Sequence, residues 1–418
     1  MAIGVIDCDN FYVSCERIFR PDLKKVPCIV LSNNDGCIIA RSKEVKEMGI
    51  PMGAPYFKYK NIIEKNNIFL FSSNYTLYEE ISNRVMGIIK SFAKKIEVYS
   101  IDEAFIDLEG IENKEEFLKN IKEKIEKWVK IPVSIGIGET KVLAKIALKF
   151  AKKNENKKIF NIINHPEKDE LLKKIDVEDI WGIGPVSAKF LREKGIFNAY
   201  QFKNLNEEWV RKNLTLRGLK ILKEIKGIKC FEIEENLERK GISSSRTFGE
   251  KIEKFEELKE AITYLISVAA ERLRSENLLA SKLHIFIMSS PFEKNFYFKD
   301  MGINLPSPTA YTPDLVKFAE KVLKIIFKEG IKYKKAGIYF CGLIKDEKKI
   351  KNIFSDKFTF TEKKKKIIFT IDKINKIFGR ETIYLAGEFI TKKWDMKQIY
   401  RSRRYTTRWE EIKGVKVL

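Results

Sequence analysis

Three carboxylates stand where the sequence predicts buried strands. Asp7 lies in the apolar run near the start of the chain, and Asp102 and Glu103 lie in VYSIDEAFIDL. A carboxylate in such a run is costly to bury without a cation beside it. A lysine in a buried salt bridge would serve, and a solvent-facing side chain is another simple alternative. Two strands that converge on carboxylates favour Mg²⁺, which takes few carboxylates and shares its other positions with phosphate oxygens.

Two of these carboxylates are neighbours in sequence, which limits how they can act together. Successive side chains of a regular strand point to opposite faces, so Asp102 and Glu103 reach one site only if the chain bends there. Two-metal catalysis needs carboxylates that bridge cations about 3.5–4 Å apart. Asp9 shares a strand face with Asp7 and is either a further ligand or the cap of the next helix. We favour the cap, with Asn10 as its alternative.

Two aromatic residues follow the first carboxylate. A helix is expected over NFYVSCERIF, and its first backbone amides would open towards the metals, where a helix N-terminus holds phosphate well. A Phe11 or Tyr12 ring packed against C2′ of a nucleotide sugar would exclude a 2′-hydroxyl. From the residues alone, ordinary core aromatics are the better interpretation of both side chains.

Three lysines are candidates for contacts with a triphosphate: Lys43, Lys46 and Lys152. Lys43 and Lys46 are three residues apart, so they share one face of the short helix expected over EVKEMG. In a chain with this many lysines, a solvated helix face is the simple alternative. These three side chains therefore need a nearby phosphate site before they indicate binding.

A glycine motif lies in the middle of the chain. The GIGP sequence, with Gly182 and Gly184, is typical of a helix-hairpin-helix. In that motif the glycine turn lets backbone amides approach a DNA phosphate without hindrance from side chains. A simple turn between two helices is the alternative.

The charge of the chain restricts its partners. Lys and Arg number 80 against 58 for Asp and Glu, a net charge of +22, which attracts nucleic acid or an anionic membrane. No apolar run approaches the roughly 18 residues of a spanning helix, and the N-terminus lacks the features of a signal peptide. We therefore expect a cytoplasmic protein with no membrane partner. Six cysteines without a CxxC pair and only two histidines argue against zinc.

The coarse pattern predicts several domains in 418 residues. The first 160 residues alternate strands and helices, with helices expected over residues 75–92, 114–128 and 140–153. The NNDG sequence predicts a hairpin turn between the strands VPCIVLS and CIIARS. A small helical segment, a linker, an α+β domain and a lysine-dense tail are expected over residues 166–236, 238–245, 246–345 and 346–418.

Five ordered motifs resemble Y-family lesion-bypass DNA polymerases. They are VIDCDNFYVSCE, LSNNDGCIIARSKEVKEMGIPMG, VYSIDEAFIDL, SIGIGETKVLAKIALKFAK and IWGIGP. The NNDGCIIARS motif and the C-terminal sequence WDMKQIYRSRRYTTRWEEI are similar to the UmuC branch of that family. The resemblance covers nearly the whole chain. It implies an α+β right-hand fold with a palm (1–10 and 78–165), short fingers (11–77), a helical thumb (166–238), an α+β little finger (241–345) and a basic C-terminal tail (346–418).

The resemblance also implies roles for the carboxylates. Asp7, Asp102 and Glu103 would be the catalytic, metal-binding carboxylates, with the backbone carbonyl of Cys8 as an added ligand of two Mg²⁺ ions. The implied activity is template-directed DNA synthesis of low fidelity across lesions, in DNA repair and the SOS response. A DNA-binding scaffold with an inactive core is one alternative. A different palm-type enzyme, such as a nucleotide cyclase or a two-metal nuclease, is the other.

The resemblance assigns the nucleotide contacts as well. Tyr12 would be the sugar gate that selects deoxynucleotides, with Phe11 beside it. Lys46 and Lys152 match positions that contact the triphosphate. Lys43 stands where many relatives outside the UmuC branch have tyrosine, which puts its role in question.

Partners follow from the same resemblance. Primed template DNA and dNTP are expected, together with a sliding clamp, a UmuD-like subunit and a recombinase filament. The sequence IKNIF lies where relatives carry a clamp-binding peptide, although Ile350 replaces the usual glutamine. Asn352, Ile353 and Phe354 still fit an apolar plug.

Overall fold

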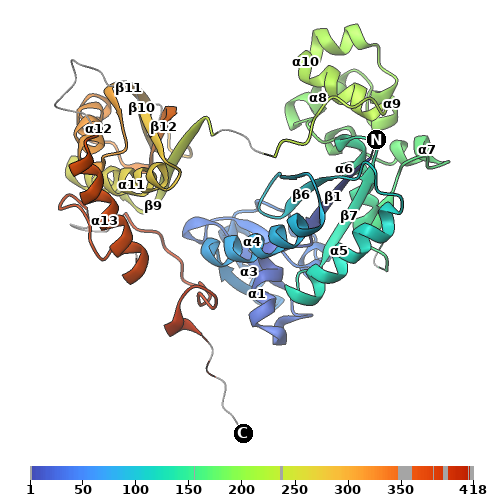
Figure 1. The fold of residues 1–418 in the computed structure, drawn as a ribbon, viewed down its shortest axis with the longest axis horizontal. Coiled ribbons are helices and arrows are strands. Elements are labelled where there is room, and N and C mark those ends of the chain that lie inside the picture. Colours follow the sequence, from blue (N-terminus) through green and yellow to red (C-terminus); the bar gives the residue numbers. More distant parts are fainter. Residues whose placement is uncertain are drawn as a thin grey trace. The chain divides into compact units, whose positions relative to one another are not determined.

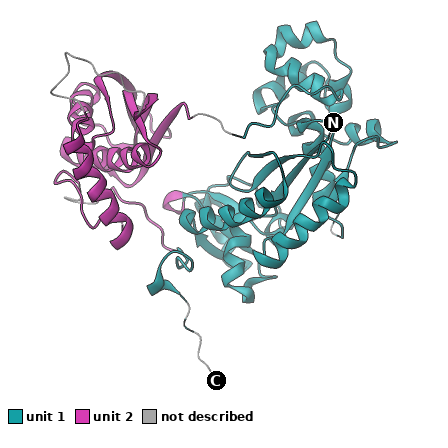
Figure 2. Cartoon of the chain, in the orientation of Figure 1, with its two compact units in different colours: residues 1–32, 36–237, 400–418 teal, residues 33–35, 238–399 magenta. Residues whose placement is uncertain are grey.

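The chain folds into two compact units, each described here by itself (Figure 2). The computed structural model describes residues 2–154, 156–235, 239–346, 360–379, 381–388, 394–412 and 414. The first unit comprises residues 1–32, 36–237 and 400–418, and the second comprises residues 33–35 and 238–399. The expected clamp-binding residues Asn352, Ile353 and Phe354 lie outside the described residues. No helix in the described part of the chain is long and apolar enough to cross a membrane.

A five-stranded sheet forms the centre of the first unit (Figure 1). Its order is β5 (Ile96–Val98), β6 (Glu103–Asp107), β1 (Ile3–Cys8), β7 (Val133–Gly138) and β8 (Ile159–Asn161). β1 is antiparallel to both of its neighbours, and β8 is parallel to β7. All six residues of β1 are buried, as expected for a strand with both faces covered.

Alternate residues of β1 pack against different helices. Ile3 and Val5 pack with Ala144 and Leu148 of α6 (Lys141–Lys153). The opposite face packs against α4 (Tyr75–Phe92) and α5 (Lys114–Trp128). On β7, a Cβ atom at Gly136 would lie 2.2 Å from the Ala144 carbonyl oxygen, so only glycine permits this approach of α6. Helix α6 therefore packs directly on this face of the sheet.

A three-stranded sheet, in the order β3-β2-β4, lies in the same unit. Its strands are β2 (Cys28–Leu31), β3 (Ile38–Arg41) and β4 (Phe69–Ser72). The expected NNDG turn joins β2 to β3, with positive φ at Asn34 and Asp35. Nearby helices are α1 (Phe11–Phe19), α2 (Lys43–Glu47) and α3 (Tyr56–Lys65), with a 3₁₀ turn, η1 (Pro21–Leu23), after α1. α1, α2 and α4 begin and end close to the expected limits, whereas α3 and β4 were not expected.

The helical segment of the first unit surrounds its own apolar core, to which α6 also contributes. Its elements are α7 (Lys168–Lys173), the 3₁₀ turn η3 (Val177–Asp179), α8 (Pro185–Glu193), α9 (Ala199–Lys203) and α10 (Glu207–Ile225). The expected pair of helices around GIGP is therefore a 3₁₀ turn followed by α8. The first limb is short because Ile180 already has extended backbone angles.

The second unit is an antiparallel sheet with helices packed on it. The sheet has the order β11 (Phe298–Thr309), β10 (Leu278–Ser289), β12 (Tyr333–Lys345) and β9 (Gly241–Ile252). Helices α11 (Phe255–Ser275) and α12 (Thr312–Ile326) share its apolar core. β9 begins at Gly241, inside the stretch expected as a linker, and β11 and α12 were not expected. The expected α+β class is nevertheless confirmed for the whole chain.

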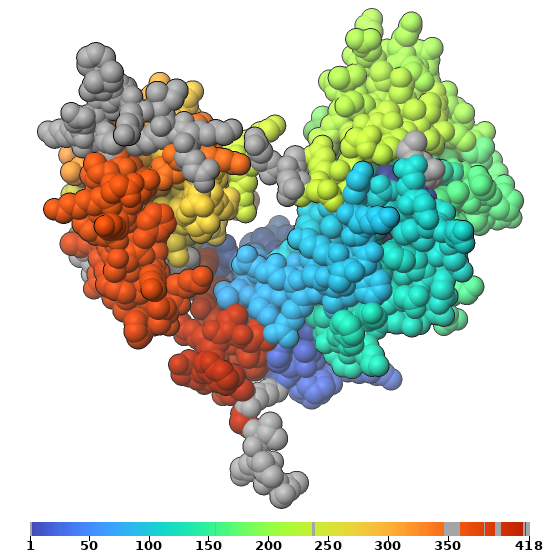
Figure 3. Space-filling view, in the orientation of Figure 1, coloured from blue at the N-terminus to red at the C-terminus, as the bar shows by residue number. Residues whose placement is uncertain are grey.

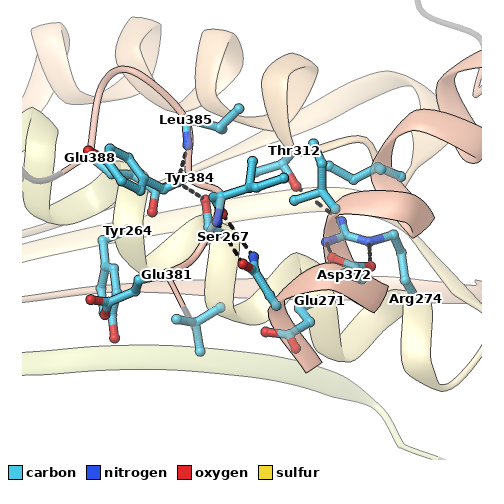
Figure 4. Close-up of a pocket in the computed structure, with 15 residues that line it drawn as sticks. Tyr264, Ser267, Glu271, Arg274, Thr312, Asp372, Glu381, Tyr384, Leu385 and Glu388 are labelled. Carbon is cyan, nitrogen blue, oxygen red and sulfur yellow. Dashed lines mark hydrogen bonds and ion pairs between the residues drawn. The ribbon is translucent and has the colours of Figure 1, made fainter. Parts of the chain in front are cut away.

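The C-terminal region contributes to both units. Helix α13 (Glu362–Phe378) and residues 381–388 pack on α11 in the second unit, around the small cavity in Figure 4. Arg274 of α11 donates to both carboxylate oxygens of Asp372, at 2.6 and 2.7 Å. Residues 400–412 instead belong to the first unit and end with the 3₁₀ turn η6 (Trp409–Glu411). The stretch expected as one lysine-dense tail is therefore an ordered part of the fold over its described residues.

Candidate active site

Two of the predicted carboxylates face each other across neighbouring strands. Asp7 of β1 lies directly opposite Glu103 of β6 in the antiparallel register. Both share strand faces with residues that pack on α6, because Asp7 alternates with Ile3 and Val5. The Asp7 and Glu103 carboxyl groups lie within hydrogen-bonding reach of each other. Asp7 is only 5% exposed, so this contact is made inside the protein.

The third carboxylate joins this pair through a bend. Asp102 precedes β6 and lies outside the strand, where the amides of Tyr99 and Ser100 both donate to the Glu103 carbonyl. The Asp102 carbonyl accepts from the Cys8 amide at 2.9 Å, which fixes the bend beside the end of β1. The Asp102 side chain accepts from Ser100 Oγ at 2.6 Å. The bend that a shared role of Asp102 and Glu103 requires is therefore present.

Two lysines of α6 reach these carboxylates. Lys152 Nζ lies 2.5 Å from Asp7 Oδ1, and Lys145 Nζ lies 2.5 Å from Glu103 Oε1. The two lysines are seven residues apart, which places them two turns apart on one helix face. Lys152 was expected near the site, whereas Lys145 was missed. Its signal in the sequence was this seven-residue spacing in a helix that must cover the sheet.

The charges of the cluster perturb one another. Burial and the hydrogen bond with Glu103 raise the pKa of Asp7 to about 8, against the effect of the Lys152 charge. Burial would raise the pKa of Glu103 too, but the hydrogen bond from Asp7 and the Lys145 charge outweigh it, and that pKa is lowered. The contact between the two carboxyl groups therefore moves their pKa values in opposite directions, upwards for Asp7 and downwards for Glu103.

A cleft of about 320 Å³ opens beside the carboxylates. Asp7, Asp102 and Lys152 lie at one part of its wall, and residues from α1, β3 and α2 complete it. The cleft therefore combines anionic and cationic walls. A metal ion bound to a phosphate chain has both charges, and this cleft is lined for such a ligand.

Aromatic side chains form another part of this wall. The Tyr12 ring stacks on Tyr78 with centroids 4.5 Å apart and an interplanar angle of 18°, and Tyr75 meets it edge-on. Phe11 also lines the cleft and is buried. The stacking fixes the Tyr12 ring, so its edge presents a rigid limit to whatever occupies the cleft.

The cationic wall includes one residue that sequence reasoning missed. Lys46 and Arg41 line the cleft together with Lys152. Burial lowers the pKa of Lys46, and the charges of Lys152 and Arg41 lower it further. Arg41 was missed because it stands in a strand, IIAR, whose sequence reads as apolar. Its signal was the alternation that places it on the same face of β3 as Ile39, which also lines the cleft.

Of the predicted residues, Lys43, Asp9 and Glu103 do not line the cleft, and Glu103 adjoins it only through Asp7. Lys43 Nζ lies 3.8 Å from Glu47 on the exposed side of α2, and Lys43 is not among the lining residues. The preference for Asp9 as the helix cap is wrong. Asn10 occupies the cap position with left-handed backbone angles, and Asp9 instead accepts from Ser134 Oγ at 2.8 Å and faces Lys158.

The glycine motif lies apart from the carboxylates, in the helical segment. Gly182 has a φ of 94°, and a Cβ atom there would lie 2.7 Å from Ile221 Cδ1, so glycine is required. Gly184 precedes α8 as its N-cap, with no atom close to the position of an added Cβ. The start of α8 is therefore open to a ligand such as a phosphate.

The carboxylates provide oxygen donors only, which suits a hard divalent cation. Within the described ranges, no three His, Cys, Asp or Glu side chains already form a ligand cluster. Lys145 and Lys152 contact two of the carboxylates instead. A cation beside Asp7 and Glu103 would favour the ionised form of both carboxyl groups. The residues therefore fit a magnesium site.

Known proteins resemble the chain along its length. The impB/mucB/samB family model matches residues 6–149, its C-terminal domain matches 239–353, and a domain of unknown function, DUF4113, matches 365–415. Protein UmuC of Salmonella typhimurium is 36% identical over 99% of this chain and 100% of its own length. DNA polymerase IV of Picrophilus torridus is 30% identical over 72% of this chain and 89% of its own length.

Solved structures agree with this at the level of fold. A Y-family DNA polymerase chimera of Dbh and Dpo4 matches 82% of this chain and 100% of its own, with a TM-score of 0.71 and 24% identity. The insertion ternary complex of Dbh DNA polymerase matches with a TM-score of 0.58. The chain therefore has the fold of these DNA polymerases and belongs to the impB/mucB/samB family.

Proposed function

We propose that this translesion DNA polymerase joins nucleotides to a primer at the cleft beside Asp7, Asp102 and Glu103. The register that sets Asp7 opposite Glu103, with Asp102 in the adjoining bend, is the observation that carries the proposal. In this reaction the primer 3′-hydroxyl attacks the α-phosphate of a dNTP, and pyrophosphate leaves. The site must therefore hold a hydroxyl, a triphosphate and their charges together.

Asp7, Asp102 and Glu103 would hold two Mg²⁺ ions, with the Cys8 carbonyl at the end of β1 as an added ligand. When bound, these ions supply the charge stabilisation that phosphoryl transfer needs. The rigid β1–β6 pairing keeps the carboxylates in register. The Ser100 hydroxyl, 2.6 Å from Asp102 Oδ1, orients that side chain.

Lys46, Lys152 and Arg41 would bind the triphosphate. Burial and the charges of Lys152 and Arg41 lower the pKa of Lys46, and a bound polyanion would relieve the repulsion among these cations. Lys152 would exchange its contact with Asp7 for one with phosphate as that carboxylate turns to the metal. Tyr12, held by Tyr78, would contact the sugar and exclude a 2′-hydroxyl.

The remaining parts would hold the DNA. We assign residues 1–10 and 78–165 to the palm, 11–77 to the fingers, 166–238 to the thumb and 241–345 to the little finger, with 346–418 as a C-terminal region. The open start of α8, with Gly182 and Gly184 before it, would receive a backbone phosphate of the primed template. A sliding clamp, a UmuD-like subunit and a recombinase filament are further proposed partners.

Primer extension with the conservative variant Asp102→Asn tests the proposal. The expected loss is about 10³-fold, because removal of a metal ligand affects the transition state by several kcal/mol. Asp107→Asn is the matched control, since Asp107 lies at the far end of β6. Within the described residues, its side chain accepts a hydrogen bond only from the backbone of its own turn. Binding to primed DNA should be equal in both variants. Equal synthesis by Asp102→Asn and Asp107→Asn would contradict the proposal.

A second measurement tests the metal site without synthesis. Ca²⁺ and dNTP together should raise the melting temperature of the chain, because ligands that bind only the folded state stabilise it. The same increase should be absent in Asp102→Asn. An equal increase in that variant would place the cation elsewhere. Analysis of the products formed from dNTP and primed template would also distinguish a polymerase from a cyclase, a nuclease or a DNA-binding scaffold.

A further inference from the structure

The last described stretch of the chain packs in the first unit. The residues that it contacts lie near the other end of the sequence. Tyr400 exchanges two hydrogen bonds with Ser72 at the end of β4, at 2.9 and 3.1 Å. Arg401 forms a parallel β-bridge with the same residue. The side-chain amide of Asn74 donates to Ser402 Oγ at 3.0 Å. It also lies 3.3 Å from the backbone carbonyl oxygens of Ser402 and Arg403. Backbone and side-chain hydrogen bonds thus both hold this stretch to the first unit.

A second set of contacts reaches α1. The Ser402 hydroxyl donates to Glu16 Oε1 at 2.9 Å, and the Tyr78 hydroxyl donates to the same oxygen at 2.7 Å. Three residues later, the Tyr405 ring stacks on Phe19 with centroids 4.5 Å apart and an interplanar angle of 14°. Figure 3 shows the red C-terminal residues against the blue N-terminal ones. Glu16 is fully buried, so Ser402 completes a site inside the first unit.

The stretch just before these contacts belongs to the second unit. Trp394 is 1% exposed and donates from Nε1 to Glu260 at 2.9 Å. Its ring lies 4.9 Å from that of Tyr264. Five residues, 395–399, separate Trp394 from Tyr400. A connection of this length spans at most about 20 Å when fully extended.

The other end of the second unit is also tied to the first. The chain leaves the first unit after residue 237, and just before that point the Glu234 amide donates to Glu97 Oε2 at 2.8 Å. Glu97 is itself paired with Lys141 of α6. Both ends of the segment 238–399 therefore continue into residues bound in the first unit.

We infer that residues 400–412 are an intramolecular anchor that ties the C-terminal end of the second unit to α1, β4 and α4. The segment 238–399 is then joined to the first unit at both of its ends, in addition to the turn 33–35 between β2 and β3. A second connection raises the effective concentration of one unit at the other without any new contact between them. The anchor gives a function to the distal half of the domain of unknown function, which matches residues 365–415.

Hydrogen exchange and single-molecule FRET on the full-length chain test the anchor. The double variant Ser402→Ala/Tyr405→Ala removes its hydroxyl and ring contacts while leaving the residues that it contacts, in α1, β4 and α4, unchanged. Trp409→Ala is the matched control, because this aromatic residue of the same stretch is 87% exposed. Dyes on non-natural residues at positions 119 and 324 report the distance between the units.

In the wild-type chain, amides of residues 400–405 should exchange at least 10-fold slower than in the double variant. The distribution of distances between the dyes should broaden in that variant alone. For a cross-linking control, the native Cys37, Cys230 and Cys341 are replaced by serine. A bismaleimide bridge between introduced Phe19→Cys and Tyr405→Cys should then keep the distribution of dye distances narrow.

Three results would overturn the inference. Residues 400–405 could exchange as an unfolded peptide in the wild-type chain. The distance distribution could stay equally narrow in the double variant, or broaden in spite of the bridge. Neither readout uses DNA synthesis, so the anchor is tested separately from the proposed catalytic role.

Discussion

Buried carboxylates in the two units have different partners. In the second unit, Glu260 accepts from Trp394 Nε1, and Asp314 lies 2.7 Å from Lys364 Nζ. Asp372, which is only partly buried, accepts two hydrogen bonds from the buried Arg274 (Figure 4). Each of these carboxylates is matched by a donor from another segment, and each fastens the C-terminal region to α11 or α12. These hydrogen bonds and ion pairs are enough to explain why the carboxylates lie inside the unit.

The carboxylates of the first unit are arranged differently. Asp7 meets another carboxyl group, that of Glu103, and Asp7 lines an open cleft. The lysines that approach them, Lys145 and Lys152, come from one helix, and Lys152 also lines the cleft. Burial alone therefore does not distinguish a functional carboxylate. In the first unit, burial and a neighbouring carboxyl group at the edge of a cleft together disfavour the ionised form of Asp7.

The largest expected effect on the structural side of this comparison concerns Asp372. The Asp372→Asn variant leaves the Arg274 guanidinium, 3% exposed, without its charge partner. An uncompensated buried charge costs about 3–4 kcal/mol, so α13 should lose hydrogen-exchange protection. Glu362→Gln, at an exposed position of the same helix, is the control. A loss below about 1 kcal/mol would show that this pair is not structural.

A buried carboxylate without a cation sharpens the comparison. Burial raises the pKa of Glu16 to about 7 from 4.5, against the hydrogen bonds from Tyr78 and Ser402. The folded state then binds more protons than the unfolded state between these values, so this group lowers stability as pH rises from 4.5 to 7. Relative to wild type, Glu16→Gln should gain up to about 3 kcal/mol at pH 8 and nothing below pH 4.5.

Denaturant unfolding at several pH values measures this difference. Glu116→Gln, at an exposed position of α5, controls for the loss of one negative charge. A difference between Glu16→Gln and wild type that stays constant with pH would show that Glu16 does not titrate in this range.

The aromatic wall of the cleft gives a smaller effect on selectivity. Tyr12→Ala should raise ribonucleotide insertion relative to deoxynucleotide insertion by about 100-fold, because the ring edge no longer excludes the 2′-hydroxyl. Tyr12→Phe keeps the ring stacked on Tyr78 and should keep the discrimination. The ratio of kcat/KM values for the two nucleotides measures it. Unchanged selectivity in Tyr12→Ala would place the sugar elsewhere.

The smallest effect compares two lysines of one helix. Lys46→Ala should raise the KM for dNTP about 10-fold, since it removes a charge-assisted contact worth about 1.5 kcal/mol. Lys43→Ala should change it less than about 2-fold, because Lys43 lies outside the cleft beside Glu47. Steady-state kinetics decide between them. Equal effects of the two variants would refute the cleft as the triphosphate site.

Much of the first unit could be predicted from the sequence. β1, β7 and α4 were found because long β-branched runs and helical spacing give clear signals, and the alternation within β1 places Asp7 on one face. β11 was missed because it contains Pro306 and Pro308. A strand with prolines is possible only at a sheet edge, and an edge position depends on tertiary structure.

The second unit and the contacts of the site were harder to predict. Four consecutive lysines follow Glu362 at the start of α13, and they hid the apolar residues Ile368 and Ile371 that pack on the core. Lys145 and Arg41 carry no motif of their own and become visible only when α6 and β3 are placed beside the carboxylates. Asp9 was misassigned because the left-handed conformation of Asn10 has no signature strong enough to predict.

A crystal structure with primed template, a non-hydrolysable dNTP and Mg²⁺ tests the central claim most directly. We predict cations about 2.1 Å from carboxylate oxygens of Asp7 and Asp102, with Lys152 on a phosphate oxygen. Cations bound elsewhere, with Lys152 still paired to Asp7, would contradict it.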